Sequence, residues 1–146
     1  IDLPVEARRV AEFLSMVADE RQVAVKVNGD AKVQADQILV QRAIMNLLSN
    51  AIRHADAGST VSVALRRDGA SAQVNVSNHG PGIPSDQLDR VFQRFVRLDD
   101  ARARSDGGTG LGLPIVKSVM HAHGGEVLVT SEVPGMTTFT LVFRDP

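Results

Sequence analysis

Apolar residues recur along the chain with two periods, one typical of helices and one of strands. Steps of three and four residues over 3–19 predict an amphipathic helix. The same spacing follows Asp36, a good N-cap residue, and predicts a second helix that ends near 53–55. A third helix is expected over 113–123, where Gly124-Gly125 would end it.

Alternation of apolar and polar residues predicts three pairs of strands. They are expected at 24–27 with 32–35, at 61–65 with 72–76, and at 127–129 with 138–142. The Asn28-Gly29 pair favours a tight hairpin in the first of them. Together these elements predict an α+β fold in which one mixed sheet is covered on one face by three helices.

The segment 78–112 differs from the rest, because it is rich in glycine and dense in Arg and Asp. A connection of this length in a compact domain is typical of a lid or a binding loop. A short capped helix is expected inside it over 85–92, and its small and charged residues after Asp99 predict a mobile lid in the empty protein.

Composition narrows the class of protein. The 146 residues suffice for one domain, and 43% apolar with 23% charged residues is ordinary globular usage. A net charge of −1 disfavours nucleic-acid binding, and the absence of cysteine excludes disulfides and thiol chemistry. No apolar run approaches the roughly 20 residues that cross a bilayer. Because the chain begins with Ile1, we expect a fragment of a longer protein.

Two amides lie four residues apart on one face of the second predicted helix, and two basic residues follow them. Asn46 and Asn50 are the amides, and Arg53 and His54 come one turn later. An isolated Asn pair is most often solvated or caps nearby backbone. Asn50, however, stands among apolar residues, so its amide needs a polar partner. The second interpretation is therefore that Asn50 binds Mg²⁺ together with phosphate oxygens.

Two glycine-rich segments complete the candidate chemistry. Residues 78–84 (NHGPGIP) follow a strand, and they form either an ordinary turn or a close approach of backbone to a flat ligand whose polar edge Asn78 reads. Residues 107–113 (GGTGLGL) run into the third helix, where unpaired N–H groups and the helix dipole favour phosphate. A Walker-type NTPase and a Rossmann oxidoreductase are disfavoured, because the Gly-Lys-Ser/Thr sequence and the strand-turn-helix order are missing.

Taken in order, four segments resemble the N, G1, F and G2 boxes of sensor histidine kinases. They are 46–54 (NLLSNAIRH), 78–84, 92–97 (FQRFVR) and 107–113. The resemblance covers essentially the whole chain, and residues 18–36 resemble the lead-in of the heavy-metal-sensing branch. It implies that residues 1–146 form the catalytic and ATP-binding domain, with the Bergerat (GHKL) two-layer sandwich of about five strands on three helices.

The resemblance also implies ATP and Mg²⁺ as cofactors and assigns residues to them. Asn50 would be the Mg²⁺ ligand, Asn46 and Arg97 would be catalytic, and a lid over about 84–109 would be clipped to the body by Phe92 and Phe95. The remaining phosphate contacts would be Arg53, His54, Gly108, Thr109, Gly110, Leu111, Gly112 and Leu113. The base would meet Asn78, Gly80, Gly82, Ile83 and Thr138.

Two departures qualify what the resemblance implies. The family usually has Asp where this chain has Asn78, so the bond to the adenine amino group should be weaker by about 1 kcal/mol. Related ATPases such as gyrase place a Glu at the position of Asn46 to activate water. An amide offers no such base, which favours transfer of the phosphoryl group over hydrolysis.

The phosphoacceptor is expected outside the chain. In this family the acceptor His is normally followed by an acidic residue, whereas the four histidines here precede Ala or Gly: His54, His79, His121 and His123. Metal binding by the His121/His123 pair is disfavoured, because their rings point apart on a helix. Expected partners are therefore the dimerisation and phosphoacceptor domain of the same protein and a cognate response regulator.

The resemblance also implies where the parent protein acts. It would be a membrane-anchored homodimer of the bacterial inner membrane, with this domain on the cytoplasmic side. Two alternatives stay open. One is a degenerate nucleotide-binding or interaction module without kinase activity, in which Asn78 has cost ATP binding. The other is an independent ATPase of the gyrase type, which Asn46 disfavours.

Overall fold

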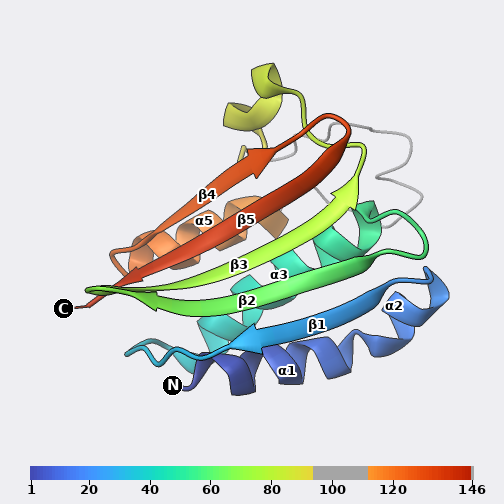
Figure 1. The fold of residues 1–146 in the computed structure, drawn as a ribbon. Helices are drawn as coiled ribbons and strands as arrows, with labels where there is room; N and C mark the ends of the chain where they lie inside the picture. The colour runs from blue at the N-terminus through green and yellow to red at the C-terminus, as the bar shows by residue number, and fades with distance from the viewer. Residues whose placement is uncertain (94–111, 146) are drawn as a thin grey trace.

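A five-stranded mixed sheet forms one layer of the protein. The computed structural model describes residues 1–93 and 112–145, and Figure 1 shows the strands in the order β1-β2-β3-β5-β4. β1 runs parallel to β2, and the other neighbours are antiparallel. The strands are β1 (Ala24–Gly29), β2 (Thr60–Asp68), β3 (Ser71–Gly80), β4 (Glu126–Ser131) and β5 (Gly135–Arg144).

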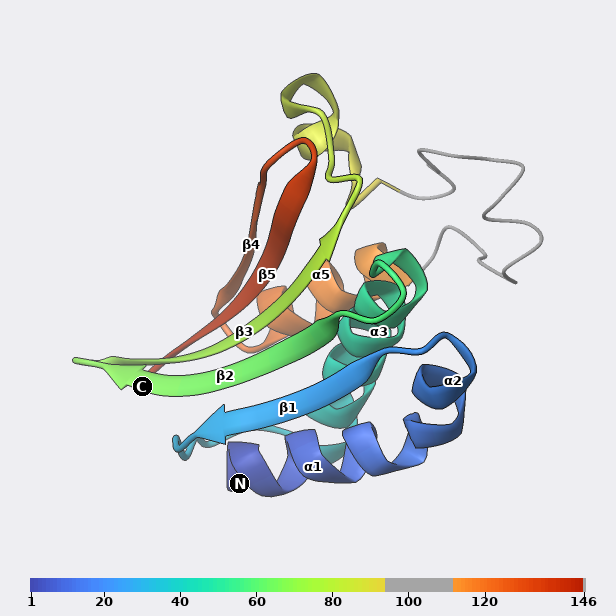
Figure 2. The same ribbon diagram turned by 45° about the vertical axis from the view of Figure 1, so that its right-hand side comes forward.

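Helices form the second layer and cover one face of the sheet, as the two views in Figures 1 and 2 show. The expected α+β two-layer fold is therefore confirmed. The described helices are α1 (Leu3–Phe13), α2 (Ser15–Glu20), α3 (Gln37–His54), α5 (Gly112–Ala122) and the short 3₁₀ helix η1 (Ser85–Arg90). Among them, no helix combines the length and the apolar character needed to cross a membrane.

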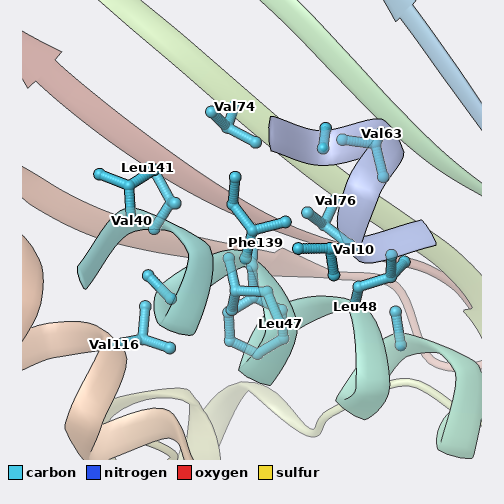
Figure 3. Packing of buried hydrophobic residues seen from close by; sticks show 14 of the residues in the cluster. Val10, Val40, Leu47, Leu48, Val63, Val74, Val76, Val116, Phe139 and Leu141 are labelled. Atoms are coloured by element: carbon cyan, nitrogen blue, oxygen red, sulfur yellow. The ribbon is translucent and has the colours of Figure 1, made fainter. Parts of the chain in front are cut away.

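The core lies between α3 and the inner face of the sheet. Leu47 and Leu48 of α3 pack toward Val74 and Val76 of β3 and Phe139 of β5, and all five are buried (Figure 3). Burial of side chains of this size contributes roughly 1.5–3 kcal/mol each. This packing fixes α3, which carries both candidate amides, against the sheet.

α3 begins where the sequence predicts. The Asp36 carboxylate accepts a hydrogen bond from the Leu39 amide at 3.0 Å and so caps the helix. The ring of His123, the residue just after α5, contacts this N-cap. Its Nε2 accepts a hydrogen bond from the Asp36 amide at 3.1 Å, and its Nδ1 lies 2.8 Å from the carbonyl oxygen of Val119. The end of α5 is thereby held at the start of α3.

The predicted hairpin around Asn28-Gly29 is wrong. Residues 32–35 form no strand, and β1 pairs only with β2 among the described residues. The backbone of the following segment is instead bonded to the start of the chain, because the Leu3 amide donates to Ala31 and the Val33 amide donates to Ile1, each at 3.0 Å. These groups are therefore not available to extend the sheet.

Two helix predictions also need correction. The first helix is interrupted at Leu14, whose ψ of 5° separates α1 from α2. The helix expected over 85–92 is a 3₁₀ helix that ends at Arg90. At both places the backbone departs from α-helical geometry, and the spacing of apolar residues in the sequence does not indicate this.

Candidate functional site

Asn46 lies at the contact between α3 and α5 and carries an unpaired donor. Its Nδ2 is buried and has no hydrogen-bond partner among the described residues. Gly112, the first residue of α5, is its neighbour, since a Cβ at Gly112 would lie 3.9 Å from Oδ1 of Asn46. Buried polar groups are nearly always bonded, so this amide points to a ligand that accepts a hydrogen bond.

The beginning of α5 favours the same kind of ligand. The first N–H groups of an α-helix have no partner within the helix, and the helix dipole makes this end positive. Within residues 112–122, the first turn carries no acidic side chain that would offset this field. The start of α5 and Asn46 thus combine into a donor-rich, anion-attracting position.

Asn50 lies one turn further along α3. Its Oδ1 accepts a hydrogen bond from Nη2 of Arg53 at 3.3 Å, and the carbonyl oxygen of Arg53 accepts from Nη1 of Arg21 at 3.0 Å. His54 ends the helix and is exposed. A neutral amide oxygen is a hard donor, and Mg²⁺ in nucleotide sites commonly takes one or two protein oxygens together with phosphates and water. Asn50 fits that requirement.

A row of polar side chains crosses the inner face of the sheet at one end. Asn78 of β3 stands opposite Thr137 of β5, which stands opposite Ser131 of β4. Asn78 and Thr137 are 4% and 5% exposed. The hydroxyls of Ser131 and Thr137 are 2.6 Å apart, and the Ile83 amide donates to the Ser131 hydroxyl at 2.8 Å. Elsewhere this face is apolar, so the row marks a place for a polar ligand edge.

Thr138, which the family resemblance assigned to the base pocket, lies on the opposite face of the sheet. Its hydroxyl is 2.8 Å from that of Ser77, with which it is paired in the ladder. Because successive side chains in a strand alternate, the buried Phe139 places Thr137 inward and Thr138 outward. Counting back two positions from Phe139 would have identified Thr137; nothing comparable in the sequence marks Ser131.

Gly80 and Gly82 are required by contacts within the protein. A Cβ at Gly80 would overlap the carbonyl oxygen of His54, and one at Gly82 would overlap that of Glu132. Gly82 also has a φ of +79°, a conformation that favours glycine. These glycines therefore let the end of β3 approach the end of α3 and the β4–β5 connection closely.

The remaining predicted residues divide between the two sides of the undescribed segment. Gly112 and Leu113 open α5. Phe92 contacts the core, where its ring meets that of Phe139 edge to face with centroids 5.9 Å apart. The lid that the sequence analysis predicts to be mobile lies outside the described residues except for its first part, and so do six assigned residues: Phe95, Arg97, Gly108, Thr109, Gly110 and Leu111.

Comparisons with known proteins agree with this arrangement. The family model of histidine kinase-, DNA gyrase B- and HSP90-like ATPases matches residues 35–146. Sensor protein CzcS of Cupriavidus metallidurans is 45% identical over 143 residues, which cover 98% of this chain and 30% of that protein. Sensor histidine kinase CusS of Escherichia coli K12 is 40% identical over 136 residues, which cover 92% of this chain and 28% of that protein.

Solved structures match over the full chain. The mycobacterial sensor histidine kinase MprB has a TM-score of 0.85 at 33% identity and covers 100% of this chain, which spans 98% of that structure. Full-length ShkA in complex with AMPPNP has a TM-score of 0.85 at 28% identity, and the match covers 100% of this chain and 31% of that one.

The chain belongs to the family of histidine kinase-, DNA gyrase B- and HSP90-like ATPases. Within that family it is the ATP-binding catalytic domain of a two-component sensor histidine kinase. It spans about 30% of the length of the curated relatives CzcS and CusS.

Proposed function

We propose that this domain binds ATP with Mg²⁺ and supplies the γ-phosphoryl group to a histidine of a separate dimerisation domain. The observation that carries the proposal is the buried, unpartnered Nδ2 of Asn46 beside the start of α5. Phosphate oxygens accept hydrogen bonds and carry negative charge, so they satisfy both the free donor and the helix dipole.

The nucleotide phosphates lie between α3 and the glycine-rich segment that leads into α5. Asn46, Gly112 and Leu113 come from the described residues, and the family resemblance adds Gly108, Thr109, Gly110 and Leu111. Arg53 adds positive charge in the last turn of α3, where His54 is a second basic residue. Arg97, also assigned by the resemblance, stabilises charge on the γ-phosphoryl group during transfer.

Asn50 holds Mg²⁺ through Oδ1. When bound there, Mg²⁺ would neutralise negative charge on the phosphates. Asn46 contributes a donor rather than a base, because an amide cannot take a proton from water. The site therefore positions the phosphoryl group for another acceptor, and transfer is favoured over hydrolysis.

The adenine lies against the polar row at the end of the sheet. The Asn78 amide oxygen accepts from the adenine amino group, and the buried hydroxyl of Thr137 adds a second polar contact. Gly80, Gly82 and Ile83 complete this wall, as the resemblance implies. Thr138 has no part in it, since its hydroxyl pairs with Ser77 on the other face.

The parent protein is a membrane-anchored bacterial homodimer that phosphorylates a cognate response regulator, with this domain on the cytoplasmic side. Its resemblance to the heavy-metal-sensing branch, carried by residues 18–36, supports a metal signal. The signal itself is read outside this domain.

Calorimetric titration tests nucleotide binding directly, because the chain has no Tyr or Trp for intrinsic fluorescence. We expect ATP to bind in the micromolar to low millimolar range, and Asn50→Ala to remove the gain that Mg²⁺ provides. Asn28→Ala, an exposed Asn on β1, is the matched control and should bind as the wild type does. Absence of binding at several millimolar ATP would favour the degenerate interaction module.

Phosphotransfer is tested by adding the separately produced dimerisation domain of the same protein. Label from [γ-³²P]ATP should appear on its histidine only when both domains are present. Steady release of phosphate by this domain alone would contradict the proposal and indicate an independent ATPase.

A further inference from the structure

Two hydrogen bonds of Arg53 in the described part of the chain join it to different partners, one through its side chain and one through its main chain. Its guanidinium donates to Oδ1 of Asn50 at 3.3 Å, and its carbonyl oxygen accepts from the guanidinium of Arg21 at 3.0 Å. Arg21 is the C-cap residue of α2 and lies outside the four boxes at 46–54, 78–84, 92–97 and 107–113 that resemble those of sensor histidine kinases. The side chain and the main chain of Arg53 are therefore restrained independently.

The side-chain contact conflicts with a metal at Asn50. An oxygen bound to Mg²⁺ lies about 2.1 Å from the ion, so a guanidinium nitrogen 3.3 Å from the same oxygen would be less than about 6 Å from Mg²⁺. Like charges at this distance repel strongly. The 3.3 Å separation is also long for an N–H···O bond, so the contact is readily broken.

We infer that Arg53 exchanges partners when Mg²⁺-nucleotide binds: its guanidinium leaves Asn50 Oδ1 and binds a phosphate, while Arg21 keeps the Arg53 main chain in place. The inference rests on the proposed function, because it takes Asn50 as the metal ligand. A planar guanidinium suits phosphate oxygens at least as well as it suits an amide oxygen. Before nucleotide arrives, Arg53 occupies the oxygen that the metal needs.

Arg21 acts as a positioning residue in this exchange. Carbonyl groups in the last turn of a helix lack partners within it, and the helix dipole makes that end negative, so the Arg21 guanidinium is bound there both by its hydrogen bond and by its charge. The segment just after α3 is also bonded to the sheet, because the Asp56 amide donates to the carbonyl of His79 at 2.8 Å. With the main chain held, the Arg53 guanidinium exchanges partners by rotation of its side chain.

Nuclear magnetic resonance of arginine Nε–H groups follows the exchange directly. Arg53→Lys identifies the Arg53 signal by its loss. In Asn50→Ala without ligand this signal should already differ from that of the wild type, because its partner is gone. In the wild type, AMPPNP with Mg²⁺ should move the Arg53 signal together with the backbone signal of Gly112 and the side-chain signal of Asn50.

Two outcomes would overturn the inference, and they differ in what else they overturn. If Gly112 and Asn50 respond at saturating Mg²⁺-AMPPNP while Arg53 stays at its ligand-free position, the exchange is wrong and the proposed function stands. If none of the three signals responds, the proposed function fails and the exchange fails with it.

The role of Arg21 is tested with Arg21→Met and Arg21→Lys, measured by calorimetry. Arg21→Met should weaken Mg²⁺-AMPPNP binding about threefold to tenfold, and Arg21→Lys, which keeps a cationic donor, should restore most of it. Arg66→Met removes an exposed arginine on β2 and is the matched control. Unchanged binding in Arg21→Met, or equal weakening in both Arg21 variants, would contradict the positioning role.

Discussion

The two halves of α3 differ in how the buried polar groups beside them are bonded. In the first half, the carboxylate of Glu6 from α1 is almost wholly buried and accepts from Arg9 at 3.1 Å, Gln37 at 2.9 Å and Gln41 at 2.6 Å. The second half begins at Asn46, whose Nδ2 is buried without a partner in the described residues. The protein itself satisfies the first group, whereas in the proposed function a ligand satisfies the second.

Because of this difference, we expect one part of α3 to contribute mainly to folding stability and the other mainly to ligand binding. A buried carboxylate with every hydrogen bond satisfied holds α1 on α3, and loss of the carboxylate would break all three of these hydrogen bonds at once. An unpaired buried donor contributes nothing to stability, and it gains a partner only on ligand binding. Substitutions in the two halves should therefore change different measured quantities.

The largest effect is expected from Glu6→Ala. Its removal breaks three hydrogen bonds to a buried charged group, so the free energy of unfolding in urea should fall by about 2–4 kcal/mol. Glu12→Ala, an exposed glutamate on the same helix, should change it by less than about 0.5 kcal/mol. Nucleotide affinity of the folded Glu6→Ala protein should be unchanged; a marked loss would couple the two halves and contradict the separation.

Asn46→Ala should show the converse pattern. Loss of a hydrogen bond to a charged phosphate costs about 1.5–3 kcal/mol, or about tenfold to 150-fold in ATP affinity by calorimetry. The free energy of unfolding should stay the same or rise, because the variant removes an unpaired buried donor. A loss of stability with unchanged ATP affinity would show that Asn46, like Glu6, stabilises the fold and does not bind the ligand.

Asn78→Asp tests whether the polar row at the end of the sheet binds the adenine amino group. A carboxylate strengthens the bond to the adenine amino group by about 1 kcal/mol, which corresponds to about fivefold tighter ATP binding. GTP carries an oxygen in place of that amino group and should gain nothing. Equal gains for both nucleotides would show that residue 78 does not read the amino group.

The smallest expected effect on ATP binding distinguishes the roles of two adjacent threonines. Thr137→Val removes a buried hydroxyl from the row and should weaken ATP binding by about 1 kcal/mol or less. Thr138→Val removes the bond to Ser77 on the outer face and should change only the free energy of unfolding. If Thr138→Val weakens ATP binding and Thr137→Val does not, the assignment of faces is contradicted.

The sequence predicts what depends on local periodicity and misses what depends on distant pairing. Four-residue spacing is enough to put Asn46 and Asn50 on one face of a helix. The hairpin after Gly29 is predicted wrongly, because its backbone partners are residues 1–3 rather than β1.

Glu6 is not identified either, although Gln37 and Gln41, four residues apart, contact it. Its partners on α3 are 31 and 35 residues away in sequence. No motif joins segments so far apart, and a single glutamate in an amphipathic helix is most often exposed. Its burial becomes visible only when α1 is placed on α3.

A crystal structure of this domain with AMPPNP and Mg²⁺ tests the central claim most directly. A phosphate oxygen should lie about 3 Å from Nδ2 of Asn46, at the start of α5, while Glu6 keeps its partners on Arg9, Gln37 and Gln41 unchanged. A nucleotide bound elsewhere, with Nδ2 of Asn46 still unpaired, would contradict the assignment of the second half of α3 to ligand binding.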